Sequence, residues 1–188
     1  MDLTKLNKRK TYIGLQYGTS FIAKEIRKFS KDYAPNSADI PTHICGLVYR
    51  FGEWWVYESH ADGVKKLGIP SGVRHYRASE WASVEPKFDT EYKIYHLPLL
   101  RKNLELFIGQ PYSIGDIRSL LRVALFNGAN GTQKDRKGLI CSEYIANCCP
   151  KITKYYNLPA HCITPAHFQN YIDTMGIEEV GKNDDNTK

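Results

Sequence analysis

The sequence has no long apolar segment, and it lacks the even number of cysteines that a full set of disulfides requires. Each absence argues against one class of protein. No run approaches the roughly eighteen apolar residues that a membrane-spanning helix needs, so we expect no membrane span. The first residues are polar and basic and lack the apolar stretch of a signal peptide. We therefore expect a cytoplasmic protein, or one that is virion-associated or released on lysis if its source is a phage. The five cysteines are an odd number, which argues against a complete disulfide framework and favours free thiols.

Concentrated positive charge is also missing, although the chain is basic. Lysine and arginine total 26 against 20 acidic residues, which gives a formal net charge of +6. This excess favours anionic partners in general. The longest basic run is only Lys8-Arg9-Lys10, however, so we do not expect nucleic acid as the partner. The Gly-rich stretch 127–137 lacks the Gly-Lys-Ser/Thr ending of a phosphate-binding loop, and we interpret it as a surface connection.

The sequence does contain alternating and helical patterns within a chain of one-domain length. With 188 residues, 42% of them hydrophobic, we expect one domain over residues 1–180 and a polar, disordered tail over 181–188. Alternation predicts strands over 11–18 and 91–97, and loop composition marks 30–41 and 61–86, the latter with one short strand. Helical spacing and capping residues predict helices over 19–29, 79–83, 101–108 and 116–125, one that starts at 141, and one over 165–171. The expected fold class is α+β, an antiparallel sheet packed against helices.

A β-hairpin over residues 42–60 is the clearest local motif. β-Branched and aromatic residues fill both arms, and Gly52 supports a tight turn between them. The hypothesis that we carry forward is a register in which Tyr49 pairs with Trp54. A slip of one residue would turn every side chain of one arm to the opposite face.

This register brings titratable residues of the two arms together. His43 lies opposite His60, and Glu58 lies opposite Cys45. Because side chains alternate with period two, all four then share one face of the sheet. His43 and Glu58 are diagonal neighbours, within reach of a hydrogen bond.

A cysteine stands where an apolar, strand-like stretch changes to helical spacing. Cys141 would lie in the first turn of the helix, where the positive potential and the unpaired N–H groups favour a thiolate. With His43 as base and Glu58 to orient the imidazole, the set matches the needs of a cysteine hydrolase acting on amides or esters. The plainer alternatives are a buried cysteine, a structural strand histidine and a solvated carboxylate.

Other cysteines, histidines and tyrosines invite further interpretations. Cysteine and histidine, the residue types that most often bind zinc, recur near the C-terminal end at Cys148, Cys149, His161, Cys162 and His167. No Cys-x-x-Cys pair is present, and adjacent cysteines in a helix point about 100° apart, so we expect neither a metal nor a cofactor. Tyr144 and Cys45 are candidates for the lining of a pocket, although a tyrosine on a helix face is more often part of the core.

The order of the motifs resembles that of a known family. Pro41-Thr42-His43-Ile44-Cys45-Gly46-Leu47-Val48 resembles the Ser/Thr-His-x-Gly-apolar strand of the permuted papain-like hydrolases of the NlpC/P60 superfamily. The strand with Glu58, the segment Gly109-Gln110-Pro111-Tyr112 and the segment Leu139-Ile140-Cys141-Ser142-Glu143 follow in that family's order. Thr164-Pro165 resembles the Thr-Pro after its nucleophile helix. The group includes the YiiX/YaeF-like proteins, is related to lecithin:retinol acyltransferase, and places its histidine before its cysteine.

The resemblance extends over roughly residues 11–170 and implies a permuted papain-like fold with the nucleophile at a helix N-terminus. It implies a thiol amidase, peptidase or acyltransferase whose substrate is a peptide, a peptidoglycan-like peptide or a lipid-linked amide. By position, Cys141 would be the nucleophile, His43 the base and Glu58 the third polar residue. His60 is the alternative third residue, because related acyltransferases use a second histidine.

The sequence departs from the family pattern in the histidine strand. Family members commonly have glycine two places after the histidine, whereas here Cys45 precedes Gly46. This departure bears on the register of the strand and so on the assignment of Glu58. A rival hypothesis, compatible with the basic balance of the chain, is a non-catalytic binding or virion-associated module on the same fold. The sequence leaves the oligomeric state open.

Overall fold

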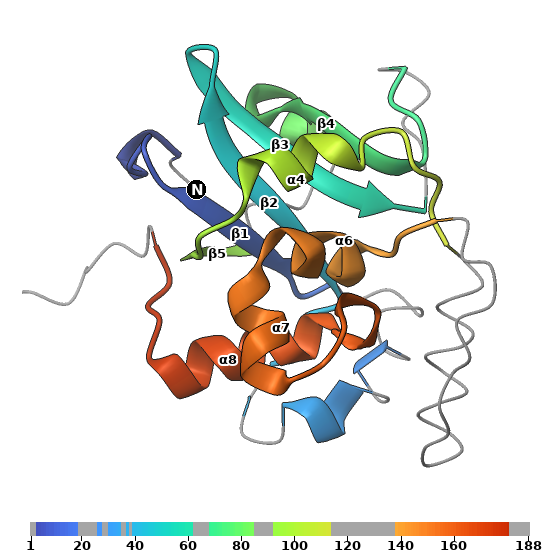
Figure 1. The fold of residues 1–188 in the computed structure, drawn as a ribbon. Coiled ribbons are helices and arrows are strands. Elements are labelled where there is room, and N and C mark those ends of the chain that lie inside the picture. Colours follow the sequence, from blue (N-terminus) through green and yellow to red (C-terminus); the bar gives the residue numbers. More distant parts are fainter. Residues whose placement is uncertain are drawn as a thin grey trace, which may run out of the picture.

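The computed structural model contains one five-stranded antiparallel sheet with most of its helices on one side (Figure 1). The structure describes residues 3–18, 26–27, 30–34, 37, 39–61, 68–84, 92–113 and 138–180. The strands are β1 (Thr11–Gln16), β2 (His43–Arg50), β3 (Glu53–His60), β4 (Gly72–Arg77) and β5 (Tyr92–His96). Their order across the sheet is β4-β3-β2-β1-β5, which places β2 at the centre.

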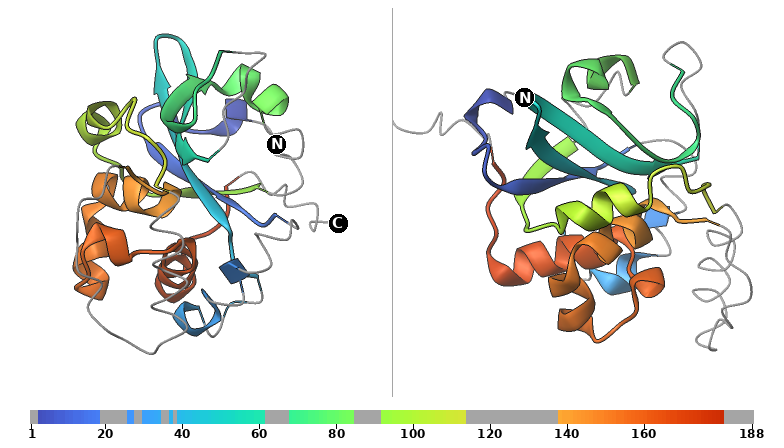
Figure 2. Two further views of the ribbon diagram at one scale, coloured as in Figure 1. Left: turned by 90° about the vertical axis from the view of Figure 1, so that its right-hand side faces the viewer. Right: turned by 45° about the horizontal axis from the view of Figure 1, so that its top comes forward.

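Most of the described α-helices follow the last strand in the sequence, and only α2 precedes it. The α-helices are α2 (Trp81–Val84), α4 (Arg101–Leu106), α6 (Cys141–Cys148), α7 (Pro150–Tyr156) and α8 (Pro165–Met175). Short 3₁₀ helices are η1 (Leu3–Lys5), η2 (Lys31–Tyr33), η4 (Ala78–Glu80) and η5 (Ala160–Cys162). The two views of Figure 2 show α6, α7 and α8 grouped on one side of the sheet.

Apolar clusters cover both faces of the sheet. On the helix side, Ile44 of β2 packs in one cluster with Tyr144 of α6. On the other side, Cys45 of the same strand packs in a second cluster with Trp81 of α2. Successive residues of a strand point to opposite faces, so the central strand is buried on both sides and its sequence is almost continuously apolar.

The hairpin register agrees with the prediction from the sequence. Tyr49 pairs with Trp54, and the two turn residues, Phe51 and Gly52, have φ angles of 51° and 85°. Both angles lie in the left-handed region, which glycine adopts without strain. This two-residue turn sets which side chains of β2 and β3 share a face.

The α+β class and the antiparallel sheet are confirmed, and several element boundaries differ from the prediction. Helix α7 was not expected, because a proline usually marks a helix end. Here Pro150 is the first residue of α7, where its missing N–H costs no hydrogen bond. Helix α8 continues past residue 171 to Met175 and ends at Gly176 in the left-handed conformation. The predicted loop 30–41 contains η2.

Some predicted features lie outside the described residues. These are the helix over 116–125, the connection over 127–137, the tail over 181–188 and most of the helix over 19–29. Within the ranges that the structure describes, no helix is both long enough and apolar enough to cross a membrane.

Candidate active site

The candidate site lies where the pairing between β2 and β3 ends. The last paired residues of these two strands are Gly46 and Tyr57. Beyond them, β2 still pairs with β1 as far as His43, and β3 still pairs with β4 as far as His60. Each strand is therefore held on its outer side only, and polar side chains lie between the two.

His43 and Glu58 meet at this place, as the hairpin register predicts. His43 Nε2 lies 2.9 Å from Glu58 Oε2, and both side chains are buried. The ring of His60 lies 5.3 Å from the ring of His43 in an edge-to-face arrangement. Glu58 therefore contacts His43 by a direct hydrogen bond, whereas His60 contacts it by ring packing.

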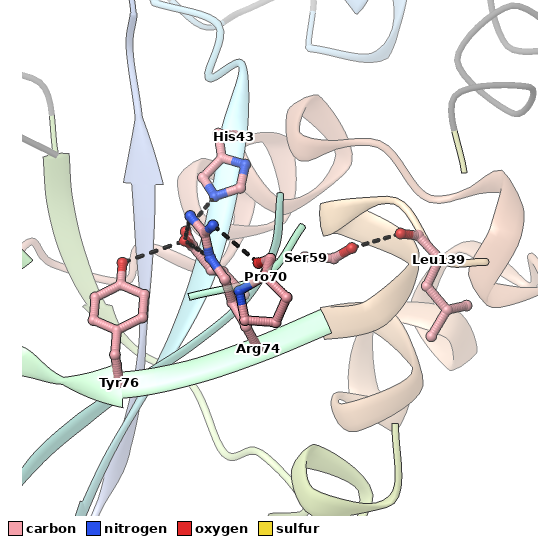
Figure 3. A network of polar contacts seen from close by, with 7 residues as sticks. His43, Ser59, Pro70, Arg74, Tyr76 and Leu139 are labelled. Atoms are coloured by element: carbon pink, nitrogen blue, oxygen red, sulfur yellow. Dashed lines mark hydrogen bonds and ion pairs between the residues drawn. The ribbon is translucent and has the colours of Figure 1, made fainter. Parts of the chain in front are cut away.

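Glu58 is held in turn by two residues that the sequence did not indicate. Arg74 donates to Glu58 Oε1 from Nε at 2.9 Å and from Nη2 at 2.6 Å, and the Tyr76 hydroxyl donates to the same oxygen at 3.3 Å (Figure 3). Arg74 also donates to the Pro70 carbonyl from Nη1 at 3.4 Å. Arg74 and Tyr76 alternate along β4, a signal that becomes useful only once β4 is known to pair with β3.

This network keeps the Glu58 carboxylate ionised. Burial alone would raise the pKa of Glu58. The hydrogen bond and charge of His43, together with the charges of Arg74 and His60, outweigh burial and hold the pKa of Glu58 well below its usual range. A buried anion therefore lies against one nitrogen of the imidazole.

The imidazole of His43 has a second neighbour in Cys141. Burial acts to lower the pKa of His43. The charge of Cys141 and its hydrogen bond with the ring, followed by the contributions of Glu58, outweigh burial and raise the pKa of His43 above its ordinary value. The cationic imidazolium is thus favoured between a carboxylate and a sulfur.

Cys141 reaches this position as the first residue of α6. Ile140 precedes it in extended conformation, and the Tyr144 N–H donates to the Ile140 carbonyl at 3.0 Å, the first hydrogen bond of the helix. The N–H groups of the first helical turn have no partner within the helix. They are oriented toward the end of the helix where the sulfur lies, and can bind negative charge.

Comparisons with known proteins assign no family. No family model matches the chain, and no curated protein is significantly similar to it. The chemistry of the site therefore carries the functional argument alone.

The two candidate pocket residues lie in the core. Cys45 is fully buried, and its Sγ fills the space where a side chain at Gly14, its partner on β1, would stand. Tyr144 is fully buried, and its hydroxyl donates to the Leu104 carbonyl at 2.8 Å. Both side chains support the elements that carry the site and present no surface to a ligand.

Of the residues considered for a zinc site, Cys148, Cys149 and His167 are buried. In the described ranges, no group of three or more metal-ligating side chains comes together. Burial, with the charge of Cys149, raises the pKa of Cys148 to about 12, and burial also raises the pKa of Cys149. His167 caps α8, since its Nδ1 accepts the Thr164 N–H at 3.1 Å, and burial lowers the pKa of His167 to about 4.

Proposed function

We propose that this protein is a thiol hydrolase that cleaves amide bonds through Cys141, His43 and Glu58, on a permuted papain-like fold of the NlpC/P60 type. The observation that carries the proposal is the placement of the buried His43 ring between the Cys141 sulfur and the Glu58 carboxylate. A merely structural histidine has no need of a thiol on one side and an ionised carboxylate on the other. Peptides, peptidoglycan-like peptides and lipid-linked amides are the substrate classes that we propose.

The first half of the reaction forms an acyl-enzyme. The Cys141 thiolate attacks the carbonyl carbon, and the carbonyl oxygen takes up the negative charge. The N–H groups at the start of α6 stabilise this oxyanion. The His43 imidazolium then gives its proton to the amide nitrogen, the C–N bond breaks, and the amine leaves.

The second half returns the enzyme to its starting state. Neutral His43 takes a proton from water, and the resulting hydroxide attacks the thioester carbon. The C–S bond breaks, the carboxylic acid product leaves, and the thiolate and imidazolium are restored.

Glu58 orients the imidazole through both steps. Because Nε2 contacts Glu58, Nδ1 is the nitrogen available to the sulfur. The charge of Arg74 helps to keep the carboxylate ionised, and the hydrogen bonds from Arg74 and Tyr76 fix its place, so it stabilises the imidazolium whenever the ring is protonated. The support for this role is that all of these side chains are buried.

Acyl transfer is the second candidate, and the packing of His60 on His43 favours it. A transferase would form the same thioester at Cys141. An amine or alcohol acceptor, rather than water, would then take the acyl group. The fate of the acyl group separates the two activities.

Alkylation by iodoacetamide tests the nucleophile without knowledge of the substrate. We expect Cys141 to react at neutral pH far faster than the other four cysteines, because its partner His43 is cationic and stabilises the thiolate. Peptide mapping by mass spectrometry identifies the labelled residue. Alkylation of Cys141 no faster than that of the buried Cys149 would refute the activated thiol and leave the binding module as the better reading.

Acyl-enzyme formation tests the reaction itself. Mixing the protein with p-nitrophenyl esters should release nitrophenol and leave an acyl group on Cys141, seen as a mass increase of the intact protein. Cys141→Ala should keep its fold and lose both signals. Loss of the adduct to water identifies a hydrolase, and its transfer to an added amine or alcohol identifies an acyltransferase.

A further inference from the structure

In the segment that leads into Cys141, both backbone polar groups of Leu139 are hydrogen-bonded to other segments. The Leu139 N–H donates to the Pro111 carbonyl at 3.0 Å, and the Leu139 carbonyl accepts a hydrogen bond from Ser59 Oγ at 2.6 Å. Ser59 is fully buried and comes from β3. Figure 3 shows this contact beside the network of His43 and Arg74.

Pro111 is itself fixed by close backbone packing. The Val73 N–H of β4 donates to the neighbouring Gln110 carbonyl at 2.8 Å. A Cβ atom at Gly138 would lie 2.3 Å from the Pro111 oxygen, and one at Gly72 would lie 2.3 Å from the Gln110 oxygen. Both distances are far shorter than a van der Waals contact. The backbone at Gly138 and Gly72 can therefore lie this close to the backbone of Gln110 and Pro111 only because these two residues have no Cβ atom.

Consecutive residues of β3 serve the two halves of the site. Glu58 contacts the base His43, and Ser59, whose side chain points to the opposite face, contacts the segment before Cys141. One short stretch of one strand therefore touches both the base and the approach to the nucleophile.

We infer that Ser59 is a positioning residue whose hydroxyl sets the place of the Cys141 sulfur relative to the His43 imidazole. The inference rests on the proposed function, in which these two groups act as a pair. Without the hydroxyl, the buried Leu139 carbonyl loses its donor and the peptide turns to find another. Because Leu139 is two residues from Cys141, that rotation moves the start of α6, and displacements of about 1 Å are enough to impair such a pair.

The test compares Ser59→Ala with Ser59→Thr, which retains a hydroxyl. The measurement is the rate of Cys141 alkylation by iodoacetamide as a function of pH, with peptide mapping and thermal unfolding of each variant. We expect Ser59→Ala to slow alkylation near neutral pH about tenfold and to shift the acid limb of the rate profile upward, because the imidazolium no longer faces the sulfur. Ser59→Thr should recover most of the rate.

Thr11→Ala is the matched control for a general loss of stability. The Thr11 hydroxyl is also buried, donates to the Leu97 carbonyl at 2.8 Å and accepts the Leu99 N–H at 2.8 Å. Thr11 pairs with Val48, at the end of β2 away from His43. This variant should lower the unfolding temperature and leave the alkylation profile of Cys141 unchanged.

The outcomes separate the inference from the proposed function. A folded Ser59→Ala protein with the wild-type alkylation profile overturns the positioning role and leaves the nucleophile in place. Slow alkylation of Cys141 in the wild-type protein overturns the proposed function instead. If Ser59→Ala does not fold, Ser59→Cys keeps a similar volume with a much weaker donor. Peptide mapping distinguishes the introduced thiol from Cys141, and an unchanged Cys141 rate there overturns the inference.

Discussion

Glu58 is completely buried, and its two oxygens divide their partners between them. Oε2 faces His43, whereas Oε1 receives both donors of Arg74 and the hydroxyl of Tyr76. A buried carboxylate without such partners would be strongly destabilising. Arg74 therefore makes it possible for an ionised residue to stand beside the imidazole.

Removal of the Arg74 guanidinium should expose this dependence. We expect Arg74→Met to lower the free energy of unfolding by about 3 kcal/mol, because it leaves the Glu58 charge buried with one fewer partner. Urea unfolding measures the change. Arg77→Met is the control on the same strand, since Arg77 pairs with Glu53 at 3.3 Å near the surface and its loss should cost under about 1 kcal/mol. Equal costs for the two variants would contradict the assigned role of Arg74.

The lowered pKa of Glu58 also predicts how stability depends on pH. A carboxyl whose pKa is lower in the folded state stabilises the fold above its unfolded pKa, near 4.5, and this contribution is lost as pH falls toward the folded value of about 2. Glu58→Gln has no such titration. The difference in unfolding free energy between wild type and Glu58→Gln should therefore shrink over this acid range. Urea titrations at several acid pH values measure the difference, and one that stays constant would show that Glu58 is not the titrating group.

The β2–β3 hairpin is the element that brings the base and its orienting residue together, and its turn has an unusual residue. Phe51 adopts a φ of 51° and is 79% exposed, with the Arg50 guanidinium over its ring at 4.3 Å. A bulky residue is strained in the left-handed region, where asparagine is better tolerated. The stacking of Arg50 offsets only part of this cost, because the ring remains largely in water.

We expect Phe51→Asn to raise the free energy of unfolding by about 1 kcal/mol through relief of the turn strain. Thermal unfolding measures the effect. Phe51→Ala is the control, because it removes the ring and keeps a residue that disfavours positive φ, so it should not stabilise the protein. A destabilised Phe51→Asn protein would mean that the contact between Arg50 and the ring outweighs the strain.

Local sequence patterns predicted those parts of the site that depend on residues close together in the sequence. The hairpin turn, with Gly52 at its second position, defines the register, and that register alone places Glu58 within reach of His43. The strand-to-helix change likewise placed Cys141 in the first turn of a helix. In both cases the deciding interactions lie between residues close in sequence.

The rest of the site depends on pairings between distant segments. Arg74 reaches Glu58 only because β4 is the strand beside β3, and Ser59 reaches Leu139 across 80 residues of chain. Neither strand order nor the path of the segment before α6 is encoded in a periodic pattern. Tyr144 and Cys45 were candidates for a pocket for the same reason, since sequence spacing does not show which buried face a side chain occupies.

At the scale of the whole molecule, helices α6, α7 and α8 pack on one face of the sheet and share a core with it. Cys148 and Cys149 lie in the cluster between them with Ile13 of β1 and Phe168 of α8 and are fully buried. Cys141 belongs to the same cluster but keeps 7% of its surface exposed and contacts His43. Side chains within such a core reach solvent only when the layers separate. The five thiols therefore report on different levels of opening.

We expect the rates of thiol alkylation to separate these levels. Cys141 should react without denaturant, while Cys148 and Cys149 should react only at urea concentrations that unfold the sheet, because they are fully buried and burial raises the pKa of both thiols. The less buried Cys162 should react at lower urea. Pulse labelling with iodoacetamide across a urea series, read by peptide mapping beside circular dichroism, measures each rate. Alkylation of Cys148 in the native protein at the rate of Cys162 would contradict a shared core, because it would require α6 to separate from the sheet while the sheet stays folded.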